Sequence, residues 1–147
     1  ARYEPPAPLW ELTQTAIAIL SRHPQGFFLM VEEAAIDRMG HRNIGSLAVR
    51  AVHELDRAVR VAREFAEEDG ETLVIVTADH ECGGLALDGY PDGPFDGDLA
   101  TLLRWATTGH TEADVPLTAI GPHARRLAGH HDNTDLFAVM VEAMDLG

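Results

Sequence analysis

The sequence predicts an α/β fold in which a central, mostly parallel sheet is flanked by helices. Two short apolar runs, Phe27–Val31 and Leu73–Thr77, predict strands buried on both faces, and the amphipathic stretch Ser46–Asp69 lies between them. Strand, helix and strand in this order form a βαβ unit, which joins parallel strands. The chain has 147 residues and is 46% hydrophobic, so we expect residues 1–147 to form a single domain.

Apolar spacing and turn residues predict the elements before the second strand. Residues Leu9–Ser21 carry apolar side chains at helical spacing and predict a first helix. The run Phe27–Val31 follows a glycine turn and is too short for a helix between turn signals. The helix over Ser46–Asp69 repeats apolar residues every three or four positions, and we expect Ser46 as its N-cap and Gly70 just beyond its end.

The second half of the chain is richer in loops. Leu73–Thr77 is rich in β-branched residues, as strands are. Glycines and prolines at about 83–98 predict a loop-rich insertion with room for one short strand, Leu85–Leu87. A short helix, a strand and a last helix are then expected at Leu99–Trp105, Val115–Ile120 and Asp135–Met144. The last helix should be capped near Asn133 or Thr134.

Composition excludes several classes of protein. The 24 acidic and 11 basic residues give a net charge of −13, which is the wrong sign for binding nucleic acid or an anionic membrane through a basic patch. All basic residues are arginines, so P-loop, Schiff-base and pyridoxal-phosphate lysines are excluded. Cys82 is the only cysteine, so a metal site needs histidine and carboxylate ligands. No apolar run predicts a membrane span, and the beginning of the chain resembles a cut end.

Carboxylates and imidazoles follow both predicted strands, where the ligand crevice of an open α/β sheet lies. The first strand is followed by Glu32, Glu33, Asp37 and His41, and the second by Asp79 and His80. Asp37 and His41 are four residues apart, so one helical turn would direct both at a single cation. Six such groups converging would repel without counter-ions, which a pair of divalent metals can supply. Chance is the alternative, because an acidic protein with eight histidines brings some of them together without a site.

Several motifs then occur in a fixed order. They are Gly-Phe-Phe-Leu-Met-Val-Glu at 26–32, Ile36-Asp37 with His41, Val76-Thr77-Ala78-Asp79-His80-Glu81 with Gly83-Gly84, His110-Thr111, Asp114-Val115-Pro116 and Gly121-Pro122-His123. In order and spacing they resemble the alkaline phosphatases. The resemblance covers nearly the whole chain but corresponds only to the C-terminal portion of that family. It therefore implies an alkaline phosphatase-like fold as a partial domain.

The resemblance also implies a set of metal ligands, position by position. One zinc ion would be held by Asp37, His41 and His110, a second by Asp79 and His80, and a neighbouring magnesium ion by Glu32. His110 is identified by the resemblance alone, because a histidine in a Thr-Gly-His-Thr loop is ordinarily a surface residue. His123 is expected to support the site from outside the ligand set or to be structural. Glu81 and Cys82 have no matched role.

The implied activity is hydrolysis of phosphate monoesters by a two-zinc mechanism with a serine nucleophile. That serine, a phosphate-clamping arginine and a carboxylate shared between magnesium and zinc have no match in this chain. Its own serines, Ser21 and Ser46, lie outside nucleophile-like segments, and Thr77 is a weak substitute. Glu33 and Arg38 also depart from the family pattern and alter the local charge. We therefore expect the chain alone to bind zinc and to be inactive or nearly so.

The resemblance implies partners beyond the phosphate monoester substrate. The N-terminal portion of the same enzyme would complete the site, and apolar sheet edges exposed without it favour a homodimer or a companion chain. Family members are usually exported, so a periplasmic or secreted location is expected. Two other hypotheses stay open: another phosphotransfer enzyme of the same superfamily, and a non-catalytic metal-binding domain. The Gly-Pro-His and His-Thr loops favour the alkaline phosphatase interpretation.

Overall fold

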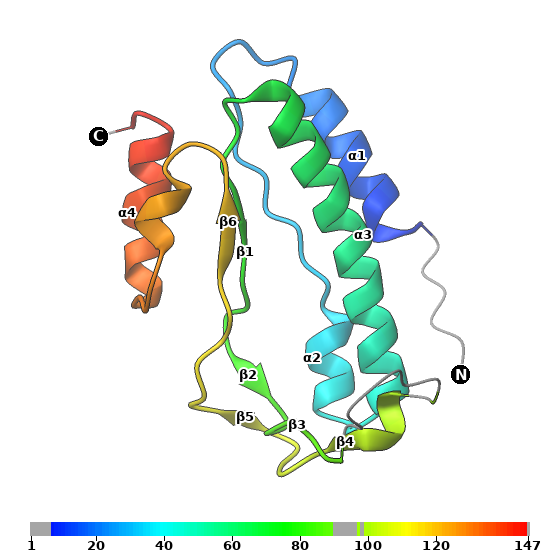
Figure 1. The fold of residues 1–147 in the computed structure, drawn as a ribbon. Coiled ribbons are helices and arrows are strands. Elements are labelled where there is room, and N and C mark those ends of the chain that lie inside the picture. Colours follow the sequence, from blue (N-terminus) through cyan, green and yellow to red (C-terminus); the bar gives the residue numbers. More distant parts are fainter. Residues whose placement is uncertain (1–6, 90–96, 98, 147) are drawn as a thin grey trace.

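The computed structural model describes residues 7–89, 97 and 99–146 (Figure 1). The α-helices among them are α1 (Leu9–Leu20), α2 (Ala35–Gly40), α3 (Gly45–Asp69) and α4 (Asn133–Ala143). The strands are β1 (Val74–Val76), β2 (Glu81–Cys82), β3 (Ala86–Leu87), β4 (Leu103–Arg104), β5 (His110–Thr111) and β6 (Thr118–Ile120). Two short 3₁₀ helices complete the set, η1 (Leu99–Leu102) and η2 (Ala124–Leu127).

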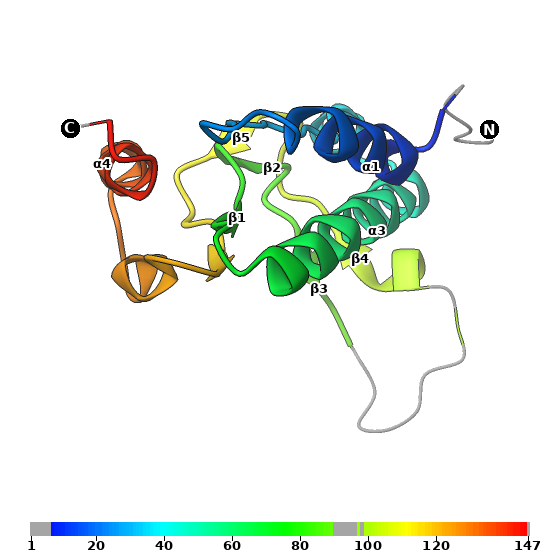
Figure 2. The same ribbon diagram turned by 90° about the horizontal axis from the view of Figure 1, so that it is seen from above.

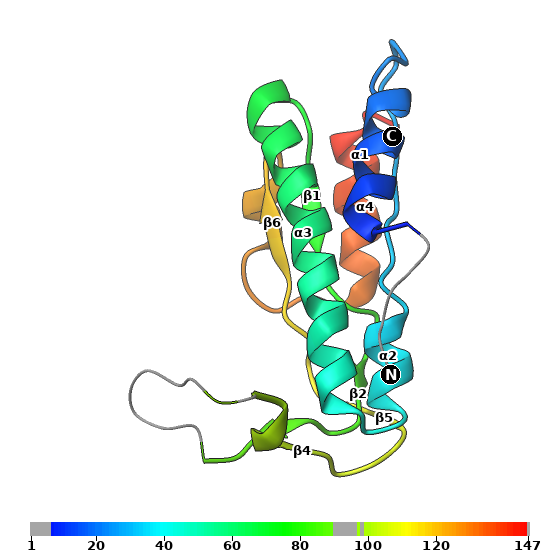
Figure 3. The same ribbon diagram turned by 90° about the vertical axis from the view of Figure 1, so that its right-hand side faces the viewer.

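The long helix α3 organises one side of the molecule. Its buried residues are all alanines, which let α1 and α2 approach it closely: Ala48, Ala51, Ala58 and Ala66. Figure 3 shows α1 and α2 one above the other along this helix. Both predicted long helices are therefore confirmed, and Gly70 ends α3 at a φ of 76°, a conformation that favours glycine.

The predicted cap of α3 at Ser46 is wrong. The helix begins one residue earlier, at Gly45, and its N-cap is Ile44, which makes no side-chain capping bond. The Ile44 carbonyl accepts hydrogen bonds from the backbone N–H groups of Leu47 (3.1 Å) and Ala48 (3.0 Å). Ser46 thus lies inside the first turn of α3. Its side chain is of a type that caps helices well, but the helical backbone already begins at Gly45.

The apolar run at residues 27–31 does not form the predicted strand. Exposure alternates along it: Phe27 is half-buried with its ring 6.2 Å from that of Phe65 on α3, whereas Phe28 and Met30 are 59% and 78% exposed. The segment is a long coil between α1 and α2 (Figure 1). An apolar pattern specifies an extended backbone but not the neighbour with which it pairs, and the described residues supply no such neighbour.

Every strand pair in the described part of the chain is antiparallel. In the central pair, Val74 lies opposite Ile120 and Val76 opposite Thr118. The strands predicted at 73–77 and 115–120 are thus present in shortened form, but the parallel pairing predicted between 27–31 and 73–77 is absent. Helices still lie on both sides of β1–β6, with α3 on one side and α4 on the other (Figure 2). This is the flanked arrangement expected of the α/β class.

The region after β2 is more extended than predicted. The short strand expected at Leu85–Leu87 is confirmed as β3, which pairs with β4. The helix expected over Leu99–Trp105 is wrong beyond Leu102, because Leu103 and Arg104 pair with β3 instead of continuing the helical turn. Residues 90–96 and 98 of the predicted insertion lie outside the described residues.

The last helix begins with a capping box. The Asp132 side chain accepts from the Thr134 N–H at 3.0 Å, and the Asp135 side chain accepts from the Asp132 N–H at 3.2 Å. The predicted cap at Asn133 or Thr134 is therefore one or two residues too late in the chain. Asp132 takes the position because its carboxylate can accept from the first free N–H groups of the helix.

Apolar side chains are poorly covered in this fold. Among the described residues, none of the large side chains is fully buried, and several on the outside are more than half exposed: Leu12, Ile19, Phe28, Met30 and Phe137. A chain of this size normally buries most of its large apolar side chains. None of the described helices is both long enough and apolar enough to cross a membrane.

Candidate metal centre

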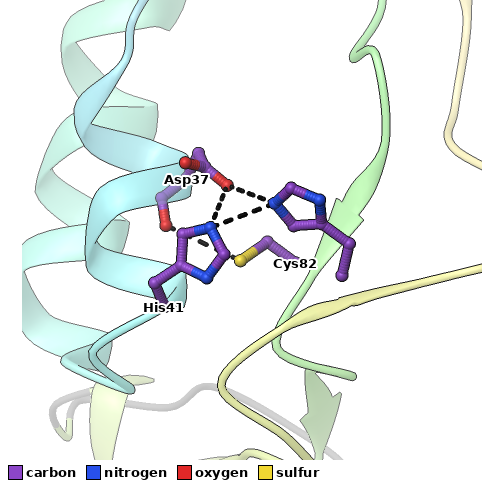
Figure 4. Close-up of side chains that lie close together, drawn as sticks. Asp37, His41 and Cys82 are labelled. Atoms are coloured by element: carbon purple, nitrogen blue, oxygen red, sulfur yellow. Dashed lines mark hydrogen bonds and ion pairs between the residues drawn. The ribbon is translucent and has the colours of Figure 1, made fainter.

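Two elements far apart in the sequence bring a carboxylate and two imidazoles together. Asp37 lies in α2 and His41 caps the end of the same helix, so their i, i+4 spacing directs both side chains to one side. Strand β5 carries His110, which lies opposite Cys82 of β2. Figure 4 shows Asp37, His41 and Cys82 pointing into the space between α2 and β2.

The three donor atoms are evenly spaced. Asp37 Oδ1 lies 3.3 Å from His41 Nε2 and 3.2 Å from His110 Nε2, and the two Nε2 atoms are 3.0 Å apart. A tetrahedral ion with ligand bonds of about 2.0 Å requires donor atoms about 3.3 Å apart. The side chains therefore have the spacing that a zinc ion needs. Oxygen and imidazole nitrogen are also ligands that zinc accepts.

A backbone carbonyl orients one of the imidazoles. His41 Nδ1 lies 2.6 Å from the Thr108 carbonyl oxygen. A carbonyl can only accept, so Nδ1 carries a proton, and Nε2 is the nitrogen that faces Asp37 and His110. Imidazoles that bind metals usually donate their second N–H in this way.

The environment of Asp37 favours its charged form. Burial opposes ionisation, but hydrogen bonds from Cys82 and His110 and the positive charge of the two imidazoles outweigh it and lower the pKa of the carboxyl. Burial raises the pKa of the Cys82 thiol to about 11, and its hydrogen bond with Asp37 and the charges of Asp37 and Glu81 act in the same direction. The site therefore combines a carboxylate with a protonated thiol at neutral pH.

Cys82 packs tightly against the end of α2. Its Sγ lies 3.6 Å from the Asp37 backbone oxygen, and a Cβ placed on Gly40 would come within 2.9 Å of Sγ. The donor atoms of Asp37, His41, Cys82 and His110 all lie within 4.8 Å of one another. Gly40 is thus the residue that allows α2 and β2 to meet at the site.

The second predicted ligand pair lies beside the first group. Asp79 Oδ2 and His80 Nε2 are 3.2 Å apart, and the His80 ring stacks on the His110 ring with centroids 3.5 Å apart. The Nδ1 atom of His80 is buried and has no hydrogen-bond partner among the described residues. The structure thus brings five of the predicted ligands into one neighbourhood.

The remaining predicted residues are not drawn into this group by any described contact. Glu32 is exposed, and the described residues offer it neither a hydrogen bond nor an ion pair. The Glu33 carboxylate accepts from the Ala35 N–H at 3.0 Å, at the beginning of α2. His123 contacts α4 instead, where its Nδ1 lies 3.6 Å from Glu142, which also pairs with Arg126. Its described contacts therefore concern the docking of α4.

Sequence reasoning assigned no role to Cys82, Thr108 or Thr111. Cys82 reaches the site through the pairing of β2 with β5, which sets it opposite His110, and its own sequence neighbourhood does not reveal that pairing. Thr108 contributes a backbone carbonyl, which no side-chain pattern reveals. Thr111 contacts the site through Glu81, and that contact depends on the pairing of β2 with β5.

Comparison with known proteins gives a consistent result. The family model described as alkaline phosphatase matches residues 2–96 and 98–146. The alkaline phosphatase of Escherichia coli (strain K12) is 36% identical over 152 residues, covering 94% of this chain and 32% of that protein. The streptomycin-6-phosphate phosphatase of Streptomyces griseus is 35% identical over 158 residues, covering 94% of this chain and 35% of that protein.

Solved structures agree with these relatives. The alkaline phosphatase from the Antarctic bacterium TAB5 superposes with a TM-score of 0.81 and 34% identity, covering 93% of this chain and 40% of that chain. A TAB5 mutant with magnesium bound in its M3 site gives the same score and identity. This chain spans about a third of the length of the curated relatives it matches. The predicted fold class, a partial α/β domain, is confirmed.

Proposed function

Because this chain belongs to the alkaline phosphatase family, we propose that it is the metal-binding C-terminal portion of an enzyme that hydrolyses phosphate monoesters. The observation that carries the proposal is the spacing of three donor atoms, 3.0 to 3.3 Å apart, contributed by α2 and β5. A divalent cation between these atoms would be held by one carboxylate and two imidazoles, which are ligands that zinc accepts.

The proposed ligand sets follow the two groups described above. One zinc ion is held by Asp37, His41 and His110. A second zinc ion is bound in part by Asp79 and His80, and a magnesium ion is bound in part by Glu32. The His80–His110 stack supports two zinc sites that are close neighbours, since it joins one ligand from each. When bound, the zinc ions supply Lewis acidity and activate oxygen nucleophiles for phosphoryl transfer.

The chain's own residues hold and orient these ions. The Thr108 carbonyl accepts from Nδ1 of His41 and so leaves Nε2 as the nitrogen directed at the site. Hydrogen bonds and imidazole charge keep Asp37 ionised, so one negative charge stands ready to offset the divalent ion. Neither residue acts as an acid or base in the proposed reaction.

The nucleophile of the proposed enzyme lies outside this chain. Ser21 follows the last turn of α1, and Ser46 lies in the first turn of α3. The Thr77 hydroxyl contacts the carbonyl oxygens of Ala78 (3.3 Å) and Pro116 (3.2 Å). None of these hydroxyl groups has a described hydrogen bond to an imidazole or carboxylate that could activate it.

The exposed apolar residues support a protein partner in the proposed enzyme. Phe28 and Met30 lie on the outer face of the segment that leads into α2, and their side chains are mostly exposed. The N-terminal portion of the same enzyme would cover this face, and a second copy of the chain is the alternative occupant. Export to the periplasm or the exterior belongs to the same proposal.

Two measurements on the purified chain test this function. Native mass spectrometry with zinc added is expected to show two zinc ions per chain, and hydrolysis of p-nitrophenyl phosphate should be absent or very slow. A burst of nitrophenol would show that the nucleophile lies within the chain. A chain that binds zinc yet stays inactive when joined to an N-terminal portion would be a non-catalytic metal-binding domain. A chain that takes up no zinc would refute the metal centre.

A further inference from the structure

We propose that Glu81 is a positioning residue that fixes the separation of the two candidate metal sites by holding β2 against β5. The inference deepens the proposed function and rests on its two ligand groups. Glu81 belongs to neither ligand set. Its side chain contacts β5, the strand that carries His110, and the turn that follows β2.

The Glu81 carboxylate accepts three hydrogen bonds. The Thr111 hydroxyl donates to Oε2 at 2.5 Å, and the backbone N–H of Gly84 donates to the same oxygen at 3.0 Å. The backbone N–H of Leu85 donates to Oε1 at 3.1 Å. Hydrogen bonds to a charged acceptor are stronger than neutral ones, so this side chain restrains both β5 and the turn beyond β2.

These hydrogen bonds matter for the metal sites because Glu81 and Thr111 are the sequence neighbours of His80 and His110. Glu81 directly follows His80, Thr111 directly follows His110, and the two residues lie opposite each other in the β2–β5 pair. Each strand is only two residues long, so backbone pairing alone holds the pair weakly. The side-chain bond therefore restrains the two backbone segments on which the stacked imidazoles are mounted.

Strand geometry separates this role from that of a ligand. Successive side chains on a strand point to opposite faces, so Glu81 and Thr111 lie on one face of the β2–β5 pair, and Cys82 and His110 lie on the other. Both oxygens of Glu81 already accept hydrogen bonds from Thr111, Gly84 and Leu85. Glu81 thus acts on the sites through the strands and not by contact with an ion.

The decisive comparison is between two substitutions of Thr111. Thr111→Val removes the hydroxyl with little change of shape, whereas Thr111→Ser keeps the hydroxyl and removes only the methyl group. Glu81→Gln places an amide nitrogen where an acceptor is required, whichever way the amide is turned, because both oxygens accept. Glu112→Gln is the matched control, since it makes the same charge change on an exposed residue next to Thr111.

Cobalt(II) titration followed by visible absorption reports the affinity and geometry of the sites. We expect Thr111→Val and Glu81→Gln to weaken Co²⁺ binding by roughly tenfold, at the low end of what loss of a direct partner of a metal ligand costs, because neither side chain has a described hydrogen bond to a ligand. Their effects should add only in part in the double variant, because Thr111 and Glu81 share one hydrogen bond and Glu81 makes two more. Thr111→Ser and Glu112→Gln should bind like the unmodified chain. Unchanged affinity and spectrum in Thr111→Val would overturn the proposal.

A second readout needs no metal. The ring proton shifts of His80 and His110 in the NMR spectrum depend on their stacking, so Thr111→Val should move both and Thr111→Ser should not. Rings that keep their shifts in Thr111→Val would overturn the role of Glu81 even if cobalt does not bind. Failure of the unmodified chain to bind cobalt would instead refute the metal centre of the proposed function. The two failures are therefore distinguishable.

Discussion

Replacing Asp37 with asparagine gives the sharpest test of the candidate metal centre. Its Oδ1 atom is shared by both imidazoles, at 3.3 Å from His41 and 3.2 Å from His110. Asparagine keeps the size and shape of the side chain but removes its negative charge. The fold should therefore survive, while the ion loses the one anionic ligand of this group.

The expected magnitude follows from linkage. Loss of an outer partner costs up to about a hundredfold in metal affinity, so loss of a direct carboxylate ligand should cost about a hundredfold or more. At free zinc a hundredfold above the dissociation constant, binding stabilises the unmodified chain by about 2.7 kcal/mol and such a variant by only about 0.4 kcal/mol. For a domain of this size these energies correspond to increases in Tm of about 5–11 °C and about 1–2 °C.

Differential scanning calorimetry with and without zinc measures this difference. The matched control is Asp56→Asn, because Asp56 is an exposed carboxylate on α3 whose described contact is a 3.9 Å pair with Arg60. Non-specific zinc binding to a chain of net charge −13 would raise the Tm of both variants alike. A full zinc-dependent increase in Asp37→Asn, or none in the unmodified chain, would refute the reasoning.

Three further predictions concern packing, pH and association. Gly40→Ala places a Cβ 2.9 Å from Cys82 Sγ and should lower the free energy of unfolding by about 1–3 kcal/mol in urea titrations, with Cys82→Ala restoring most of the loss. The pKa of Cys82 is raised from 9.0 to about 11, so the metal-free chain should keep its full stability below about pH 9 and lose roughly 1–2 kcal/mol as the pH rises toward 11. Cys82→Ser should remove this slope, and a slope that persists would assign it to another group. Phe28→Ser with Met30→Ser should change the stability of the monomeric chain by no more than about 0.5 kcal/mol, since both side chains are exposed, yet should abolish self-association in sedimentation. A larger loss would show that the two side chains pack within the chain.

Local sequence patterns were sufficient to predict the elements that form from their own residues alone. The spacing of apolar residues predicted α1 and α3, and the glycine at the end of α3 was read correctly. The i, i+4 spacing predicted that Asp37 and His41 would face the same way, and their donor atoms are 3.3 Å apart. Helical geometry is set within a few residues, so these features need no distant partner.

Pairing between strands was not predictable in the same way. The run at 27–31 has the composition of a buried strand, but its Phe28 and Met30 face outward and no described strand pairs with it. Strand β1 pairs instead with β6, in the antiparallel direction. A strand is stabilised by a neighbour that its own sequence does not specify, so composition gives the conformation and not the partner.

The sequence by itself determined the helices α1, α3 and α4, the acidic and lysine-free composition, and the carboxylate and imidazole residues that follow the apolar runs. The tertiary structure alone decided which of them meet. Asp37 and His110 are 73 positions apart, yet their donor atoms lie 3.2 Å from each other because β5 pairs with β2 against the end of α2. Residue spacing encodes geometry only within an element, whereas a metal centre depends on the packing that brings separate elements together.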